Sequence, residues 1–305
     1  MKKLLQFIIA LLLLTPCNAQ TVNLSLNLKK GETYKQVQRS KATIIETVNG
    51  QEINMVMTMY GKTTYLVQDI NDQYYSMEVT FRNLNMKMEL PQKTMEFSSS
   101  KNDTSDILST LLSEMTNKPF YIKLTKSGKV EKVQGLDSLF VTLFNRFPHL
   151  PEATKQQLKD QLMKAYGEKS MKGSIEMITS IFPDKPVALD GKWIINTQLE
   201  SGMAANMQTT FQYKGDTDSV YIIHGDGKIK TADKDAYIES NGMPLKYDLA
   251  GTMTSDIRVN KSSGWVVEAK ISQEIKGTAT IKDNPKIPGG MVIPMTMINE
   301  TEIKE

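Results

Sequence analysis

The sequence predicts an α+β protein that is mainly antiparallel β, with two curved β-rich halves separated by a helical segment. Two observations point to this class: apolar residues recur at every second position over most of the chain, and a central block has apolar residues at helical spacing. The composition is that of a globular protein, because 40% of the 305 residues are hydrophobic and 23% are charged. A chain of this length buries roughly three quarters of its extended surface, which is enough for one large domain or two smaller ones.

The N-terminal segment has the pattern of an export signal. A basic pair precedes an apolar run from Leu4 to Leu14, and at about 11 residues this run is shorter than the roughly 20 that a membrane-spanning helix needs. Small residues at Cys17 and Ala19 fit a signal peptidase site. We therefore expect residues 1–19 to be a signal peptide and the mature chain to have no transmembrane segment.

Cys17 is the single cysteine, and it has two interpretations. In a bacterial lipoprotein the lipidated cysteine directly follows a small residue, whereas Pro16 stands before Cys17 here. We therefore favour simple cleavage with Gln20 as the new N-terminus, and lipid anchoring through Cys17 is the alternative. Cleavage leaves no cysteine, and so no disulfide, thiolate nucleophile or thiolate metal site.

The region that follows residue 30 is predicted to form strands with one buried face, because apolar and polar residues alternate. The apolar members are Ile53, Met55, Met57 and Met59, then Tyr75, Met77, Val79 and Phe81, and then Leu84, Met86, Met88 and Leu90. Their parity changes between Phe81 and Leu84. A bulge or tight bend at Arg82-Asn83 would return the side chains to the same face.

The middle of the chain is predicted to be helical. Apolar spacing favours a helix over 107–115 and three more between residue 136 and residue 182, with Pro148, Pro151 and Pro183 at their boundaries. The second β region begins at Gly191-Lys192-Trp193, and Met207, Thr209, Phe211 and Tyr213 form its clearest buried parity. Within it, Gly225-Asp226-Gly227 is predicted to be a turn.

A weak internal repeat relates the two β regions. The segments Ile122–Val130 and Ile257–Val266 align with one inserted residue, and each is predicted to be part of a hairpin, at 120–134 and 255–275. A duplication would place each hairpin within its own sheet, whereas the alternative is a chance similarity, since Lys, Ser and Gly are common in turns. The predicted organisation is a signal peptide (1–19), an N-terminal β-rich half (20–135), a helical segment (136–185) and a C-terminal β-rich half (186–305).

The charged residues and histidines form no pattern that is typical of a catalytic or binding site. The 37 basic and 34 acidic residues nearly cancel, so nothing indicates nucleic acid as a partner. His149 and His224 are expected to be structural or solvated, and no known catalytic, metal-binding or phosphate-binding motif occurs. We therefore assign no catalytic residue, no metal and no cofactor. A hydrolase with carboxylates dispersed in the sequence stays open as an alternative.

Methionine is unusually frequent, with 19 residues in the chain. Many lie on the buried parity of the predicted strands, and the candidate ligand-binding set is Met55, Met57, Met59, Met77, Met86 and Met88. Methionine is flexible and polarisable, so a surface lined with it adapts to irregular apolar ligands. The alternative is a packed core that uses methionine. Asp137-Ser138-Leu139 and Asp218-Ser219-Val220 also match a short bacterial O-glycosylation pattern.

Several segments together resemble a secreted bacterial family of unknown function. They are the signal ending Asn18-Ala19-Gln20, the Gly191-Lys192-Trp193 strand, Asn241-Gly242-Met243-Pro244 and the tail Pro288–Met295. The resemblance implies no catalytic residues. At the level of architecture alone, a bent antiparallel sheet with helices is similar to periplasmic lipoprotein carriers, whose half-barrels hold acyl chains.

We therefore expect an exported, non-enzymatic protein of the periplasm or extracellular space that binds an apolar or amphipathic ligand, such as a lipid. A protein-interaction module of the cell surface or envelope is the first alternative, and the hydrolase is the second. An enclosed apolar cavity, an exposed edge or patch, and a cleft with converging acids would distinguish the three.

Overall fold

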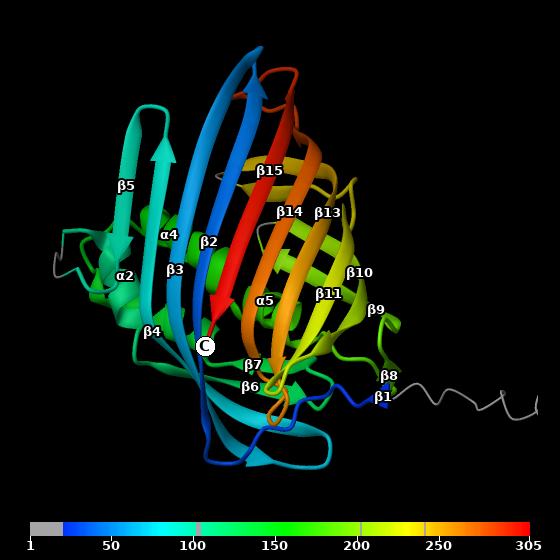
Figure 1. Cartoon of the computed structure of the whole chain (residues 1–305). Helices are drawn as coiled ribbons and strands as arrows, with labels where there is room; N and C mark the ends of the chain where they lie inside the picture. The colour runs from blue at the N-terminus through cyan, green and yellow to red at the C-terminus, as the bar shows by residue number, and fades with distance from the viewer. Residues whose placement is uncertain (1–20, 102–104, 202, 241) are drawn as a thin grey trace, which may run out of the picture.

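The computed structural model describes residues 21–101, 105–201, 203–240 and 242–305 (Figure 1). The fold is α+β and mostly antiparallel β, as predicted. The expected signal peptide and Cys17 lie outside the described residues and stay predictions. No helix in the described ranges has the length and apolar character needed to cross a membrane.

Long strands form most of the fold, and the helices lie in the middle of the chain. In chain order the elements are β1 (Thr21–Val22), β2 (Thr33–Val48), β3 (Gln51–Ile70), β4 (Tyr74–Leu90), β5 (Lys93–Ser98), α2 (Ile107–Met115), β6 (Pro119–Thr125), β7 (Val130–Gln134), α3 (Leu136–Leu143), η1 (Phe144–Arg146), α4 (Glu152–Tyr166), α5 (Glu168–Thr179), β8 (Val187–Ala188), β9 (Lys192–Ser201), β10 (Met203–Asp216), β11 (Val220–Thr231), β12 (Ile238–Ser240), β13 (Met243–Asn260), β14 (Val266–Ile281) and β15 (Met291–Lys304). The helices therefore fall where apolar spacing and the prolines predict them.

The two β regions form one continuous antiparallel sheet of 13 strands. Its order is β7-β6-β4-β3-β2-β15-β14-β13-β11-β10-β9, with β5 paired to β4 and β12 to β13. The halves join where β2 pairs with β15, which Figure 1 shows as the adjacent blue and red strands. The expectation that the two hairpins lie in separate sheets is therefore wrong. Charge complementarity contributes to the joining pair, because Lys41 lies opposite Glu300 and Arg39 lies opposite Glu302.

The proposed repeat has a counterpart in the order of the strands. Counting along the main path from β2, the β6–β7 hairpin comprises the fourth and fifth strands. Counting from β9, the β13–β14 hairpin also comprises the fourth and fifth strands. The two hairpins thus occupy corresponding positions, and duplication stays a prediction.

The predicted bulge at Arg82-Asn83 is confirmed. Lys62 pairs with Asn83 and Thr63 pairs with Phe81, so Arg82 is an extra residue in β4. Phe81 and Leu84 both become buried on the inner face. One inserted residue thus corrects the change of parity and adds local twist to the sheet.

The turn predicted at Gly225-Asp226-Gly227 is wrong, because these residues lie inside β11. Gly225 and Gly227 face inward, where a Cβ on Gly225 would lie 2.8 Å from the ring of Phe211 and one on Gly227 would lie 3.1 Å from Thr209 Oγ1. The glycines therefore allow close packing inside the curved sheet rather than reversal of the chain.

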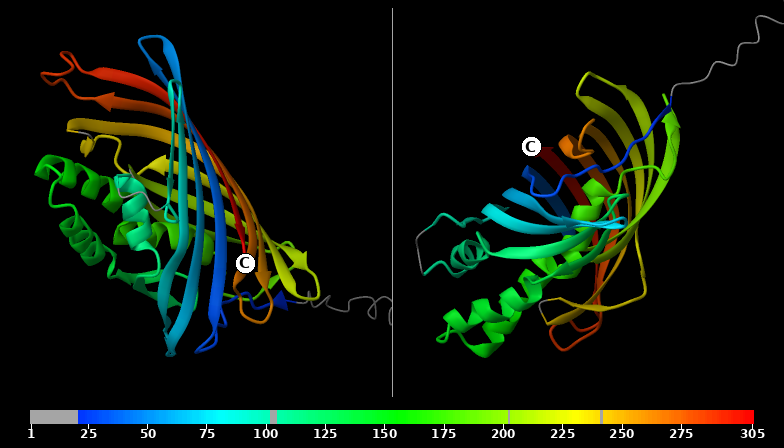
Figure 2. Two further views of the ribbon diagram at one scale, coloured as in Figure 1. Left: turned by 90° about the vertical axis from the view of Figure 1, so that its left-hand side faces the viewer. Right: turned by 90° about the horizontal axis from the view of Figure 1, so that it is seen from below.

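The helices lie on the concave side of the sheet, as Figure 2 shows. α5 contacts both of the strands at the ends of the main path, β7 and β9. At the β7 end, Glu176 Oε1 accepts a hydrogen bond from the Val130 N–H at 2.8 Å, and Thr179 Oγ1 donates to the Gly128 carbonyl at 2.6 Å. At the β9 end, Trp193 Nε1 donates to the Ile181 carbonyl, just beyond α5, at 2.9 Å. α5 thus links the two ends of the curved sheet.

A segment before β2, residues 23–30, closes one end of the fold. Leu24, Leu26 and Leu28 are buried there. Tyr75 Oη donates to the Leu26 carbonyl at 2.9 Å and accepts from the Leu28 N–H at 3.3 Å. Alternating leucines thus make this segment an apolar closure, which we call the leucine strap.

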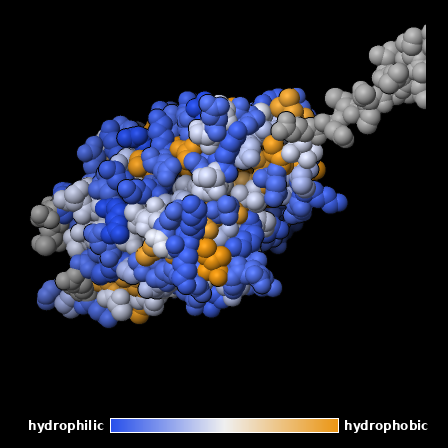
Figure 3. Space-filling model, turned by 60° about the horizontal axis from the view of Figure 1, so that its bottom comes forward, coloured by the Kyte–Doolittle hydropathy of each residue, from blue (hydrophilic) through white to orange (hydrophobic). Residues whose placement is uncertain are grey.

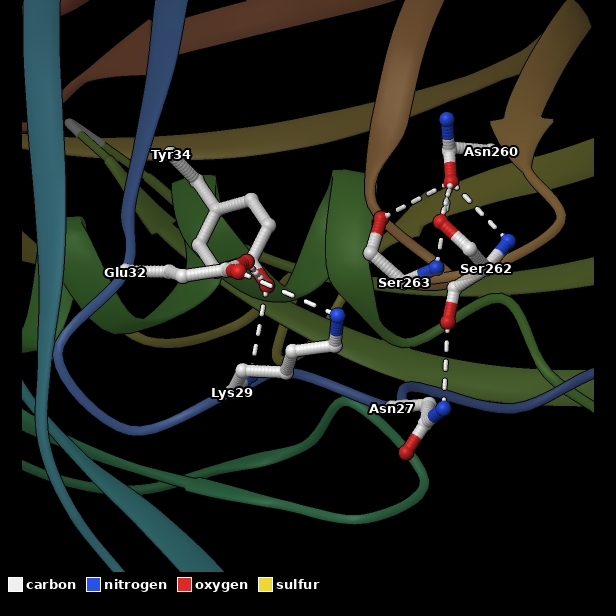
Figure 4. A network of polar contacts seen from close by, with 7 residues as sticks. All are labelled: Asn27, Lys29, Glu32, Tyr34, Asn260, Ser262 and Ser263. Carbon is white, nitrogen blue, oxygen red and sulfur yellow. Dashed lines mark hydrogen bonds and ion pairs between the residues drawn. The ribbon is translucent and has the colours of Figure 1, made fainter.

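Polar contacts hold the leucine strap against the turn between β13 and β14 (Figure 4). Asn27 donates through its backbone N–H to the Ser263 carbonyl at 2.8 Å and through Nδ2 to the Ser262 carbonyl at 3.0 Å. Asn260 Oδ1 accepts hydrogen bonds from both serines. Gly264 completes the turn with φ +68°, and any Cβ there would clash with the Ser25 carbonyl. This end of the fold is therefore sealed by both apolar and polar contacts.

Candidate functional site

Five of the six predicted methionines lie together on the inner face of the sheet. Met55, Met57 and Met59 project from β3, and Met57 lies opposite Met88 while Met59 lies opposite Met86 on β4. All five side chains are half-buried. We call this set the methionine face. It lies toward the β2–β3 turn, at the end of the strands opposite the leucine strap.

The methionine face is distinct from the hydrophobic core. In the described ranges, the core cluster and the half-buried apolar residues packed against it include none of the five methionines. Met77, the sixth residue of the predicted set, is only 1% exposed and belongs to the core. The structure therefore separates Met77 from the others, and we leave it out of the candidate site.

Neighbouring strands extend the apolar face beyond the predicted residues. On β5, Met95 lies opposite Met88 and Phe97 lies opposite Met86. Ile53 continues the same parity at the end of β3 and is 38% exposed. The alternation of Met95 and Phe97 is a sequence signal for a strand here, but a run of this length is too short to predict one by itself.

On the β2 side, the apolar face continues across the junction of the two halves. Met55 lies opposite Ile44 on β2, and Ile44 lies opposite Met297 on β15. Met297 in turn lies opposite Ile275 on β14. Four strands thus present one apolar row, which only the pairing of β2 with β15 brings together.

One carboxylate stands on this inner face. Glu46 lies opposite Ile53 on one side and Met295 on the other, so its side chain shares their face. Glu46 is half-buried, and in the described parts of the chain it makes no hydrogen bond or ion pair. Burial raises the pKa of the Tyr247 hydroxyl, and the negative charge of Glu46 raises it further. The apolar surface therefore includes an anionic group near its edge.

The surface away from the methionine face is polar. Viewed from the end that the leucine strap closes, the molecule is mainly hydrophilic, with apolar side chains in small separate patches (Figure 3). On the convex face, His224 lies between Asp226 and Asp256, and these carboxylates raise its pKa. Ser138 and Ser219 are exposed, and their modification stays a prediction. The described residues contain no group of three or more His, Cys, Asp or Glu placed to hold a metal ion.

The fold and the site define a mostly antiparallel β protein whose curved sheet carries a half-buried apolar inner face. The chain belongs to a family of unknown function, DUF6263, whose sequence profile matches residues 72–266. The predicted resemblance to a family of unknown function is thus confirmed. No curated protein matches the chain.

Several solved structures are similar in outline. Lipovitellin, in a structure titled for its lipid–protein interactions, is 9% identical with a TM-score of 0.48, over 91% of this chain and 25% of its own. This chain therefore spans only about a quarter of lipovitellin. An outer membrane channel from Pseudomonas putida F1 is 9% identical with a TM-score of 0.27, over 95% of this chain and 99% of its own. OmpT, an outer membrane protein of Vibrio cholerae, is 9% identical with a TM-score of 0.17, over 92% and 99%.

Proposed function

We propose that this protein is an exported carrier or receptor of the cell envelope that binds the apolar chain of an amphipathic ligand on the methionine face. The observation that carries the proposal is the separation of these five methionines from the hydrophobic core. Apolar side chains that a fold places on one face without packing them into its core mark a binding surface. The export signal that the first 19 residues predict would deliver the protein to the envelope.

The chemistry of the side chains suits a chain-like ligand of variable shape. Methionine has three rotatable bonds and a polarisable sulfur, so neighbouring methionines can repack around different chains. Met57 and Met88 lie opposite each other, as do Met59 and Met86, so the four residues are neighbours on one face of two adjacent strands. Such a surface favours affinity for apolar chains over discrimination among them.

Glu46 supports a ligand with a polar head at the edge of this surface. A half-buried carboxylate without a partner favours a cation or a hydrogen-bond donor beside it. An amphiphile with an amine head would place its charge at Glu46 and its chain over the methionine face. We therefore expect an amine to bind more tightly than a fatty acid of equal length.

Binding of two fluorescent probes, a fatty amine and a fatty acid of equal chain length, tests the proposal. The variant Met57→Gln/Met88→Gln keeps side-chain length and flexibility but makes one cross-strand pair polar. We expect this variant to bind both probes about tenfold or more weakly, which corresponds to roughly 1.4 kcal/mol. Glu46→Gln should weaken the amine alone.

A matched control uses the next cross-strand pair. Thr58 lies opposite Lys87 on the convex side of the same two strands. Thr58→Gln/Lys87→Gln should leave probe binding unchanged. If the parent protein binds neither probe, or if both double variants lose binding equally, the methionine face is not the binding surface.

A further inference from the structure

Three methionines form one row across the adjacent strands β3, β4 and β5 (Figure 1). Met57 lies opposite Met88, Met88 lies opposite Met95, and the register is regular at both pairs. Residues directly opposite each other share a face of the sheet, with Cβ atoms about 4.5–5.5 Å apart. Because methionine has three rotatable bonds, the two outer side chains can bring their sulfur atoms to a common point above Met88. We call these three residues the thioether row.

The thioether row is positioned by the sheet without being packed into the interior. All three side chains are half-buried. Within the part of the chain that the structure describes, none of the three belongs to the hydrophobic core or to the half-buried apolar residues packed against it. The paired strands therefore fix the three Cα positions, while the partly exposed side chains leave a path by which an ion can enter from solvent.

The neighbouring row on the same face differs at one position. Two residues along the strands, Met59 lies opposite Met86, and Met86 lies opposite Phe97 on β5. Phe97 packs against the hydrophobic core, and its side chain has no sulfur, nitrogen or oxygen atom. The neighbouring row therefore supplies two thioethers where the thioether row supplies three.

Three thioethers favour a soft metal ion. Thioether sulfur is a soft ligand that selects Cu(I), whereas carboxylates and carbonyls suit harder ions such as Mg²⁺ and Ca²⁺. The thioether has no proton to lose before it binds, unlike a thiol or an imidazolium, so its affinity for a metal does not depend on its own titration. Metal-binding motifs are built from His, Cys, Asp and Glu, so they do not detect a row of methionines.

We propose that the thioether row binds one Cu(I) ion through the sulfur atoms of Met57, Met88 and Met95. Met57 and Met88 also belong to the methionine face, but the site does not depend on the proposed amphiphile. Leucine replaces methionine well as an apolar contact, since the two side chains have similar volumes. It has no sulfur, so it cannot replace methionine as a metal ligand.

Anaerobic titration of Cu(I) in competition with the chelator bathocuproine disulfonate tests the proposal. Every protein in the comparison carries Cys17→Ser, so that no thiol competes for the ion. We expect the parent protein to bind one ion. Met57→Leu/Met88→Leu should bind it about tenfold or more weakly, since even groups that only orient metal ligands contribute that much to affinity. Met95→Leu should weaken binding in the same direction.

A matched control makes the same change in the neighbouring row. Met59→Leu/Met86→Leu alters the same two strands and the same face, and it should keep the affinity for Cu(I). Both double variants conserve apolar volume, and circular dichroism checks that both are folded. Ag(I), a soft ion of the same charge, should shift the NMR signals of the methyl groups of Met57, Met88 and Met95 more than those of the control pair.

Two further measurements identify the ligand atoms. Affinity for Cu(I) should change little between about pH 7 and about pH 5, because thioethers do not titrate there, and Zn²⁺ should bind far more weakly. The proposal is overturned if the parent protein binds no Cu(I), if Met57→Leu/Met88→Leu binds it as tightly as the parent, or if the control variant loses as much affinity.

The fluorescent fatty amine keeps this proposal separate from the proposed function. Met57→Leu/Met88→Leu should lose Cu(I) and keep the amine probe, because its surface stays apolar. A parent protein that binds Cu(I) but not the amine would support the metal site and reject the amphiphile alone. A parent protein that binds the amine but not Cu(I) would do the reverse.

Discussion

His224 Nδ1 lies 2.8 Å from Asp256 Oδ1 on the neighbouring strand, and its Nε2 lies 3.4 Å from Asp226 Oδ1 on its own strand. The imidazole is thus held between two carboxylates on the convex face. The pairing register extends this contact across the sheet, because Asp256 lies opposite Lys270, Lys270 opposite Glu302, and Glu302 opposite Arg39. A row of alternating charges therefore crosses the junction between the two halves.

The His224 contact predicts a pH-dependent stability. The hydrogen bond to Asp256 is the main cause that raises the pKa of His224, and the charges of Asp226 and Asp256 add to it. Because the pKa is higher in the folded state, the protonated imidazole stabilises the fold fully below its ordinary pKa, about 6.5. The stabilisation is lost as the pH rises through the folded-state pKa.

The variant His224→Gln measures this contribution. Its melting temperature should fall below that of the parent protein by more at pH 5 than at pH 8. Gln38→Ala is a suitable control, since it lies away from the histidine and does not titrate. An equal difference at both pH values would show that the charge on His224 does not stabilise the fold.

Two buried hydroxyls near the inward glycines of β11 predict a stabilising substitution. Thr209 Oγ1 and Ser255 Oγ are buried without a hydrogen-bond partner among the described residues. A buried hydroxyl without a partner costs about 1–3 kcal/mol. Thr209→Val keeps the shape and removes the hydroxyl, so urea denaturation should show an increase of about 1 kcal/mol or more. The neighbouring Thr210→Val, on the polar face, should change little, and equal effects would contradict this account.

The hydrogen bond that Glu176 accepts from Val130 is expected to stabilise the attachment of α5 to the end of the sheet. Glu176→Ala leaves the Val130 N–H without its acceptor, which should lower the free energy of unfolding by about 1.5–3 kcal/mol, since the acceptor is charged. Glu176→Gln keeps an acceptor oxygen and should lose less. Chemical denaturation compares the three proteins. Equal losses in the two variants would assign the effect to the charge rather than to the hydrogen bond.

The sequence predicts those features that depend on neighbouring residues. Alternation locates the inner parity of β3 and β4, and the change of parity after Phe81 locates the bulge at Arg82. The pairing of β2 with β15 joins strands from the two ends of the chain, and no local pattern encodes it. The single-sheet topology and the apolar row from Met55 to Ile275 were therefore beyond prediction.

Two errors have definite physical causes. Glycine favours turns, so the sequence predicts a turn at Gly225 and Gly227, whereas in β11 their missing side chains make room for Phe211 and for Thr209 and Met253. The leucine strap is not predicted by the sequence, because its alternation covers only Leu24, Leu26 and Leu28, just after the expected signal peptide.

Met57 and Met77 both project from the inner face of the sheet but differ in packing. Met77 is 1% exposed within the core, so Met77→Trp overpacks it and should cost roughly 1–3 kcal/mol. Met57 is half-buried outside the core, so the larger side chain in Met57→Trp should extend into open space and leave the melting temperature nearly unchanged.

The same two variants separate a ligand surface from a packed one. If ligand chains lie over the methionine face, the indole of Met57→Trp occupies their place, and binding of the fluorescent amine should weaken while stability is kept. Met77→Trp should show the reverse, a lower melting temperature with binding retained by the folded fraction. Thermal denaturation followed by circular dichroism, with probe titration below the transition, measures both properties. If Met57→Trp lowers the melting temperature as far as Met77→Trp does, the methionine face is packed interior and the carrier proposal fails.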